Sequence, residues 1–253
     1  MIIVFGTRSY GKINACGPSH HTTKFFHVSY LPLIPVESWL VLEKSADGTM
    51  RAIRAPLQFK SILAAYMRVW GPIAILLALG SGLSAVSAAS GDPIALIVAG
   101  ILTGVVVLAL LAATVFSYAV LGKLSEEEKR KRAVYALHLG YPVDPADMGE
   151  ARANVRNTLL GTIAERSRGL ATMGYRFNMD PVQAWPHVAL DPTHADEHLV
   201  TAAFTLARLE ASLPQAPQKI WMEQLHGQIW DRIVRSNFRS LQAASAGAMN
   251  RAA

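Results

Sequence analysis

A stretch of 54 residues between Arg68 and Lys123 carries a single formal charge, that of Asp92. Residues 90–93 (Ser-Gly-Asp-Pro) divide it into two apolar runs, residues 70–89 and 93–121. A membrane-spanning helix needs about 20 predominantly apolar residues to cover a hydrocarbon core of about 30 Å. Because lipid offers no partner for backbone N–H and C=O groups, each run is expected to be helical. The sequence therefore predicts an α-helical membrane protein with a transmembrane hairpin over residues 70–122.

Small residues recur on one face of each predicted span. Gly80, Ser84 and Ala88 lie four residues apart in the first span, and Gly100 and Gly104 form a G-x-x-x-G pair in the second. Small side chains let helix backbones approach closely within lipid. We therefore predict that these residues pack helices. Either the two spans pack on each other, or one face binds a second copy or another membrane protein subunit.

The basic residues indicate an orientation. Lys60 and Arg68 precede the first span, Lys123 and the basic residues of 129–132 follow the second, and the connecting loop contains only Asp92. Because Lys and Arg near span ends stay in the cytoplasm, both termini are expected there, with the tip of the hairpin outside. Residues 1–70 hold eight Lys and Arg against three acidic residues, which predicts attraction to anionic lipid headgroups rather than to nucleic acid.

Residues 1–55 are typical of a small β-rich cytoplasmic domain. Strands are expected at residues 2–5, 25–30, 39–42 and 50–53, from their aromatic and β-branched side chains. Pro32 and Pro35 are expected to end the second strand, and the Asp-Gly pair at 47–48 predicts a hairpin turn. Residues 56–69 predict an amphipathic interfacial helix in the headgroup region that runs into the first span, with a soluble core helix as the alternative.

Four short motifs carry a resemblance in residues 1–45: Phe-Gly-Thr at 5–7, Tyr-Gly-Lys at 10–12, Thr-Lys-Phe-Phe-His at 23–27 and Pro-Leu-Ile-Pro at 32–35. This segment resembles the N-terminal segment of uncharacterised bacterial two-span membrane proteins, and is distantly similar to small zinc-ribbon proteins. The resemblance indicates a kind of domain and does not imply an activity. From the spans and the charge distribution, we predict a multi-pass protein of the bacterial inner (cytoplasmic) membrane.

A zinc ribbon needs four thiolate or imidazole ligands, and here the second cysteine pair is missing. Cys16, His20, His21 and His27 could supply ligands in principle. The alternative is a degenerate ribbon that its own strands hold together. With a single cysteine, the chain cannot form an intramolecular disulfide, which fits a reducing compartment.

Residues 123–253 predict a water-soluble, helical cytoplasmic domain. Ser125 followed by three glutamates forms a capping box, and Gly140 is expected to end that helix. Asp-Pro pairs begin at Asp144, Asp180 and Asp191, and each is expected to open a helix, because Asp is a good N-cap and Pro a good first helical residue. Apolar stripes after these pairs fit a helical bundle.

One motif in this domain invites a chemical interpretation. His194, Glu197 and His198 match the H-x-x-E-H pattern of inverted zinc peptidases. On a helix the two histidines would lie one turn apart and could bind one zinc, with Glu197 activating a bound water. The alternative is a capped helix start with exposed histidines.

Other catalytic signatures are not present in the sequence, which contains no P-loop, G-x-G-x-x-G, G-x-S-x-G or C-x-x-C motif. The spans contain no Asp, Glu, Lys, Arg or His, which argues against ion-coupled transport. We therefore predict a non-enzymatic integral membrane anchor, scaffold or accessory subunit of a larger membrane assembly, with no cofactor and no nucleic-acid partner. Its expected partners are the lipid bilayer and other membrane subunits or a second copy. The alternative is a membrane-anchored zinc-dependent hydrolase that uses the H-x-x-E-H residues.

Overall fold

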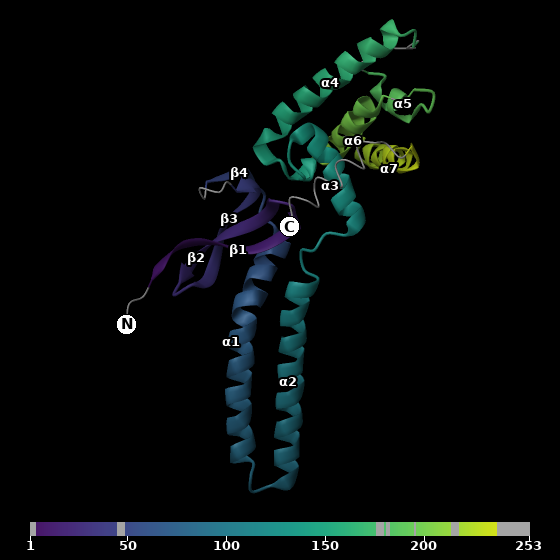
Figure 1. Cartoon of the computed structure of the whole chain (residues 1–253). Coiled ribbons are helices and arrows are strands. Elements are labelled where there is room, and N and C mark those ends of the chain that lie inside the picture. The colour runs from purple at the N-terminus through teal and green to yellow at the C-terminus, as the bar shows by residue number, and fades with distance from the viewer. Residues whose placement is uncertain are drawn as a thin grey trace. The chain divides into compact units, whose positions relative to one another are not determined.

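The computed structural model describes residues 4–44, 49–175, 180, 183–194, 196–213 and 218–236. In these residues, four strands are followed by the helices (Figure 1). The chain divides into two compact units, which are described separately. The hairpin unit comprises Met1–Ala15, His21–Trp39 and Leu57–Lys123; the helical unit comprises Cys16–His20, Leu40–Pro56 and Leu124–Ala253.

The N-terminal strands form one antiparallel sheet in the order β1-β2-β3-β4, which confirms the prediction of a β-rich segment. The strands are β1 (Phe5–Cys16), β2 (Ser19–Val28), β3 (Leu31–Lys44) and β4 (Met50–Ala55). Consecutive strands are neighbours, so short turns suffice to connect them. The turn expected around the Asp-Gly pair falls on residues 45–48, outside the described residues.

The prediction that Pro32 and Pro35 end a strand is wrong, because both lie within the first part of β3. The chain reverses instead at Ser29 and Tyr30, whose φ angles are +48° and +67°. Two consecutive positive φ angles match the twist that a two-residue hairpin requires. Proline removes one backbone donor but keeps its carbonyl, and a position near the start of a strand tolerates that loss.

The hairpin unit contains the two long helices, α1 (Phe59–Ala88) and α2 (Pro93–Ala119), which lie side by side (Figure 1). Both are long and apolar enough to cross a membrane. The Asp92 carboxylate accepts hydrogen bonds from the N–H groups of Ile94 and Ala95 and so caps α2. The segment predicted as an interfacial helix that runs into the first span forms the first part of α1, which begins at Phe59 and continues without a break into the predicted span.

A polar contact fixes the start of α1 on the sheet within the hairpin unit. The Ser61 hydroxyl donates to the Gly11 carbonyl at 2.7 Å and accepts from the Thr23 hydroxyl at 2.9 Å. Gly11 has a φ of +67°, and a Cβ there would lie 2.0 Å from the Ser61 carbonyl oxygen. Only glycine therefore lets the strand approach the helix this closely.

The helical unit contains α3 (Glu126–Leu139), α4 (Arg152–Thr172), α5 (Trp185–Leu190), α6 (Glu197–Ala211) and α7 (Lys219–Ser236), with 3-10 helices at Pro145–Asp147 and Gly149–Ala151. Helix α6 lies at the centre, and almost all of its side chains are buried against neighbouring helices. The Ser125 hydroxyl accepts from the Glu128 N–H, and Gly140 ends α3 with a φ of +76°. Both predicted helix boundaries are therefore confirmed.

The expectation that each Asp-Pro pair opens a helix is met at Asp144, which caps the 3-10 helix Pro145–Asp147, although α4 begins only at Arg152. The expectation is wrong for Asp191. Asp191 precedes a turn, because its carboxylate accepts from the Thr193 N–H at 2.9 Å and from the Tyr175 hydroxyl at 2.5 Å. Asp196 caps α6 in its place. The third pair includes position 181, which lies outside the described residues.

Candidate functional site

The outer surface of the hairpin is apolar and uncovered. In α2, none of the most apolar 18-residue window is buried by the described residues, and in α1 the corresponding share is 17%. Within α1 and α2, the leucine, isoleucine and valine residues that are at least 60% exposed are Leu76, Leu77, Leu83, Ile94, Ile97, Ile101, Leu102, Val105 and Leu108. A contiguous apolar surface of this kind marks contact with a membrane or with another protein.

The two helices contact each other through glycine–threonine pairs. A Cβ at Gly71 would lie 2.3 Å from the Thr114 Oγ1, and a Cβ at Gly82 would lie 2.1 Å from the Thr103 Cγ2. Each threonine hydroxyl donates to a carbonyl of its own helix four residues earlier, at 2.8 Å. The threonines therefore present their methyl groups and satisfied hydroxyls to the opposing backbone, which suits close packing in lipid.

The residues predicted to pack helices lie elsewhere on the hairpin surface. Gly80, Ser84, Ala88, Gly100 and Gly104 are all exposed. A Cβ placed on any of the three glycines would find no atom within 4 Å. The structure does not bring these glycines against the opposite helix. Their use by a second copy or another subunit stays a prediction.

We expect Gly82→Leu to destabilise the hairpin by about 1–3 kcal/mol, because the added side chain overlaps Thr103. Gly80→Leu is the matched control, since it makes the same change two residues away on an open face. The midpoint of unfolding in mixed detergent–SDS micelles measures both, followed by the fluorescence of Trp70 in a background where the other four tryptophans are replaced by phenylalanine. Equal loss in the two variants would contradict the assigned helix contact.

Arg68 closes the base of the hairpin. Its guanidinium donates to the Ser117 carbonyl at 2.7 Å, to the Leu121 carbonyl at 3.1 Å and to the Lys12 carbonyl at 2.9 Å. The carbonyls at a helix C-terminus lack intrahelical partners and carry partial negative charge, so a cation there is favourable. Arg68 therefore caps the end of α2 while joining α1 to β1.

An aromatic side chain completes this junction. The Tyr118 hydroxyl lies 3.4 Å from the Arg68 carbonyl oxygen, and the Tyr118 ring lies 5.2 Å from the Arg68 guanidinium carbon. The carbonyl of Arg68 lacks its usual helical donor because Pro72, four residues later, has no N–H. Tyr118 thus supplies a donor at the place where the proline removes one.

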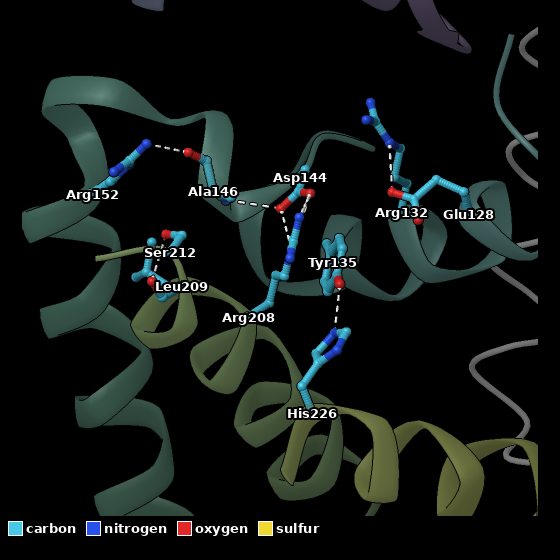
Figure 2. A network of polar contacts seen from close by, with 10 residues as sticks. All are labelled: Glu128, Arg132, Tyr135, Asp144, Ala146, Arg152, Arg208, Leu209, Ser212 and His226. Atoms are coloured by element: carbon cyan, nitrogen blue, oxygen red, sulfur yellow. Dashed lines mark hydrogen bonds and ion pairs between the residues drawn. The ribbon is translucent and has the colours of Figure 1, made fainter. Parts of the chain in front are cut away.

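In the helical unit, a buried network joins several helices (Figure 2). The Arg208 guanidinium contacts both oxygens of Asp144, with Nη2 at 2.6 Å from Oδ2 and Nε at 3.0 Å from Oδ1. Asp144 also accepts from the Ala146 N–H at 2.9 Å. A bidentate guanidinium–carboxylate pair of this kind is the strong form of ion pair. It ties α6 to the segment that follows α3.

A second contact in Figure 2 links α3 to α7, where the Tyr135 hydroxyl lies 2.8 Å from the His226 Nε2. Burial lowers the pKa of His226 to about 4 and raises the pKa of Tyr135. Both groups are therefore neutral at pH 7. The His226 ring stacks on Phe204 with centroids 4.3 Å apart, so the imidazole is part of the core packing.

The H-x-x-E-H residues do not share a helix. Helix α6 begins at Glu197, so His194 precedes it, and the His194 Nε2 is hydrogen-bonded to the Val188 carbonyl. His198 is exposed on α6, where its ring lies 6.4 Å from that of His138. The prediction of two histidines one turn apart on one helix is wrong, because Asp196 rather than Asp191 caps α6.

The other predicted metal-ligating residues lie on β1 and β2. Cys16 is the last residue of β1 and is buried, which raises the pKa of its thiol. His20, His21 and His27 belong to β2, and the His20 Nδ1 lies 3.1 Å from the Pro18 carbonyl oxygen. Among the residues that the structure describes, no three His, Cys, Asp or Glu side chains gather closely enough to hold a metal ion.

Comparison with known proteins adds no family: no protein-family model matches the chain, and no curated protein or solved structure matches it.

Proposed function

We propose that this chain is a non-enzymatic, two-span protein of the bacterial inner membrane. In this proposal α1 and α2 cross the bilayer, both termini are cytoplasmic, and the chain serves as an anchor, scaffold or accessory subunit of a larger membrane assembly. The uncovered apolar surface of the hairpin carries the proposal.

The exposure of α2 is the observation that supports the proposal most directly. A core helix of a soluble protein is mostly buried, whereas no residue in the most apolar window of α2 is buried by the described residues. Moving one fully exposed Leu or Ile side chain out of water is worth about 1.5–3 kcal/mol. Side chains such as Leu102, Val105 and Leu108 are at least 60% exposed. Lipid is the environment that removes these apolar side chains from water.

Charge supports the proposed orientation. At the base of the hairpin, Lys60, Arg68 and Lys123 flank the apolar runs, while Asp92 at the tip is the only charged residue between Arg68 and Lys123. Basic flanks of this kind stay on the cytoplasmic side. Arg68 meets the carbonyls at the end of α2, so its charge is held at the base.

A structural role for the helical unit is supported by its polar groups. Asp144 forms an ion pair with Arg208, and Tyr135 is hydrogen-bonded to His226, so these polar groups satisfy one another.

The exposed face of α2 that carries Gly100 and Gly104 offers a surface where another membrane helix could pack closely. This combination supports a subunit that presents helices to a partner on the membrane and holds a folded unit beside it.

Alkaline carbonate extraction of isolated membranes tests the proposal. We expect the full chain to stay in the membrane pellet, as an integral protein does, and to hold less than one zinc per chain after purification. Release into the soluble fraction would contradict the membrane assignment. One zinc per chain that is lost in His198→Ala would instead favour the hydrolase.

A further inference from the structure

The turn between β2 and β3 holds an aromatic side chain in a conformation that disfavours it. Ser29 and Tyr30 have φ angles of +48° and +67°, a region that costs an L-residue about 1–2 kcal/mol relative to right-handed conformations. Asn-Gly would relieve this strain in a two-residue turn. Tyr30 is nevertheless 56% exposed at the turn, although one part of its ring stacks on that of His27 with centroids 5.7 Å apart. Strain maintained at an exposed position points to a role for the side chain.

Two hydrogen bonds fix the start of β3 beside α1. The Trp70 indole N–H donates to the Pro32 carbonyl at 3.0 Å, and the Tyr66 hydroxyl donates to the Leu33 carbonyl at 2.5 Å. Trp70 is the first residue of the apolar run, and Tyr66 lies four residues, about 6 Å along the helix, before it. The start of β3 is therefore held at the level where α1 would enter the hydrocarbon.

The segment at this level is apolar and exposed. Leu33, Ile34 and Val36 are 40%, 62% and 50% exposed. Residues 25–36 contain no Lys, Arg, Asp or Glu. Apolar side chains that would be unfavourable in water thus lie next to helices that already face lipid.

Aromatic and basic groups surround this segment. Tyr66, Trp70 and Tyr118 lie at the base of the hairpin, as tyrosine and tryptophan do at the boundary between lipid and water. The Arg8 guanidinium carbon lies 5.5 Å from the centre of the Tyr30 ring. An aromatic ring with a cation beside it suits the headgroup layer, where apolar chains and phosphates meet.

We propose that residues 28–36, the β2–β3 end, form a lipid-binding surface that inserts into the headgroup layer on the side from which α1 enters the membrane. Tyr30 and Ile34 provide the inserted side chains, and Arg8 meets lipid phosphate. The occupant is lipid because the surface is continuous with the start of α1. This inference rests on the proposed membrane location of α1 and α2. It adds a second point of attachment that fixes the sheet against the bilayer.

The test uses the full chain in vesicles, with an environment-sensitive fluorophore on one cysteine in a Cys16→Ser background. One variant carries Ile34→Cys, at a mostly exposed position where the label is compatible with the fold. The reference variant carries Leu77→Cys, 69% exposed on α1 within the proposed span. Quenchers attached near the lipid headgroups or deep in the acyl chains report depth, and iodide reports contact with water.

We expect shallow lipid quenchers to act on the Ile34 label several-fold more strongly than iodide, and deep quenchers to act on the Leu77 label. If the Leu77 label is quenched by lipid while iodide reaches the Ile34 label freely, the lipid-binding surface is disproved and the hairpin stands. If iodide reaches the Leu77 label freely, the proposed membrane hairpin itself fails.

Discussion

We expect Arg208→Met to lower the free energy of unfolding of the helical unit by about 2–3 kcal/mol. Breaking a buried ion pair usually costs about 3–5 kcal/mol, because the remaining charge stays buried without its partner. Here the Asp144 side chain is 8% exposed and the Arg208 side chain 37%, so water compensates part of the loss. The Ala146 N–H still donates to the carboxylate, which also limits the effect.

Denaturant unfolding of the full chain in mild detergent, followed by tryptophan fluorescence, measures this loss, because Trp185 and Trp230 belong to the core of the helical unit. Arg156→Met is the matched control. Arg156 pairs with Glu210 at 2.5 Å, but its side chain is 45% exposed, and surface pairs contribute about 0.2–1 kcal/mol.

A double variant measures the interaction between Asp144 and Arg208 separately from the other effects of each substitution. Asp144→Asn with Arg208→Met should lose less than the two single variants together, because no uncompensated charge remains buried. If Arg208→Met loses no more stability than Arg156→Met, the buried pair does not hold α6 in place, and the account of the helical unit is wrong.

The helical hairpin could be predicted from sequence because one property of the chain decides it. A run without charges and with the length of a bilayer has few structural alternatives, and Asp92 followed by Pro93 marks the start of the second helix. The start and end of α3 could be predicted for a similar reason. The Ser125 cap and Gly140 act within one turn of the chain.

Features that depend on distant residues could not be predicted in this way. From the sequence alone, Gly80 and Gly82 are equally good candidates for a helix contact. Only the position of Thr103 on α2 determines that Gly82, and not Gly80, packs against the opposite helix. Asp191 fits the pattern of a helix cap, but Tyr175 and Thr193 take its carboxylate. For Gly82 the outcome depends on a residue of another helix. For Asp191 it depends on two other donors that hydrogen-bond to the same carboxylate.

Arg68 illustrates the same limit at the candidate site. Its place before an apolar run indicates orientation in the membrane, and that much follows from sequence. Its hydrogen bonds to the carbonyls of Ser117 and Leu121 join residues about fifty positions apart along the chain, which no local pattern reveals. The glycine–threonine contacts and the Tyr118 hydroxyl belong to the same class.

The central claim is that α1 and α2 span a membrane with the tip on one side and the rest of the chain on the other. Single cysteines in a Cys16→Ser background test it at three exposed positions: Ser90 at the tip, Leu57 before α1, and Met173 in the helical unit. Intact cells are treated with a membrane-impermeant thiol reagent, and permeabilised cells serve as the control for reactivity.

The difference in labelling between the tip and the other two positions is expected to be all or none, because a charged segment does not cross the bilayer on the time scale of labelling. In intact cells only Ser90→Cys should react, and all three variants should react after permeabilisation. Reaction of Leu57→Cys or Met173→Cys in intact cells, or protection of Ser90→Cys, would contradict the proposed membrane hairpin and its orientation.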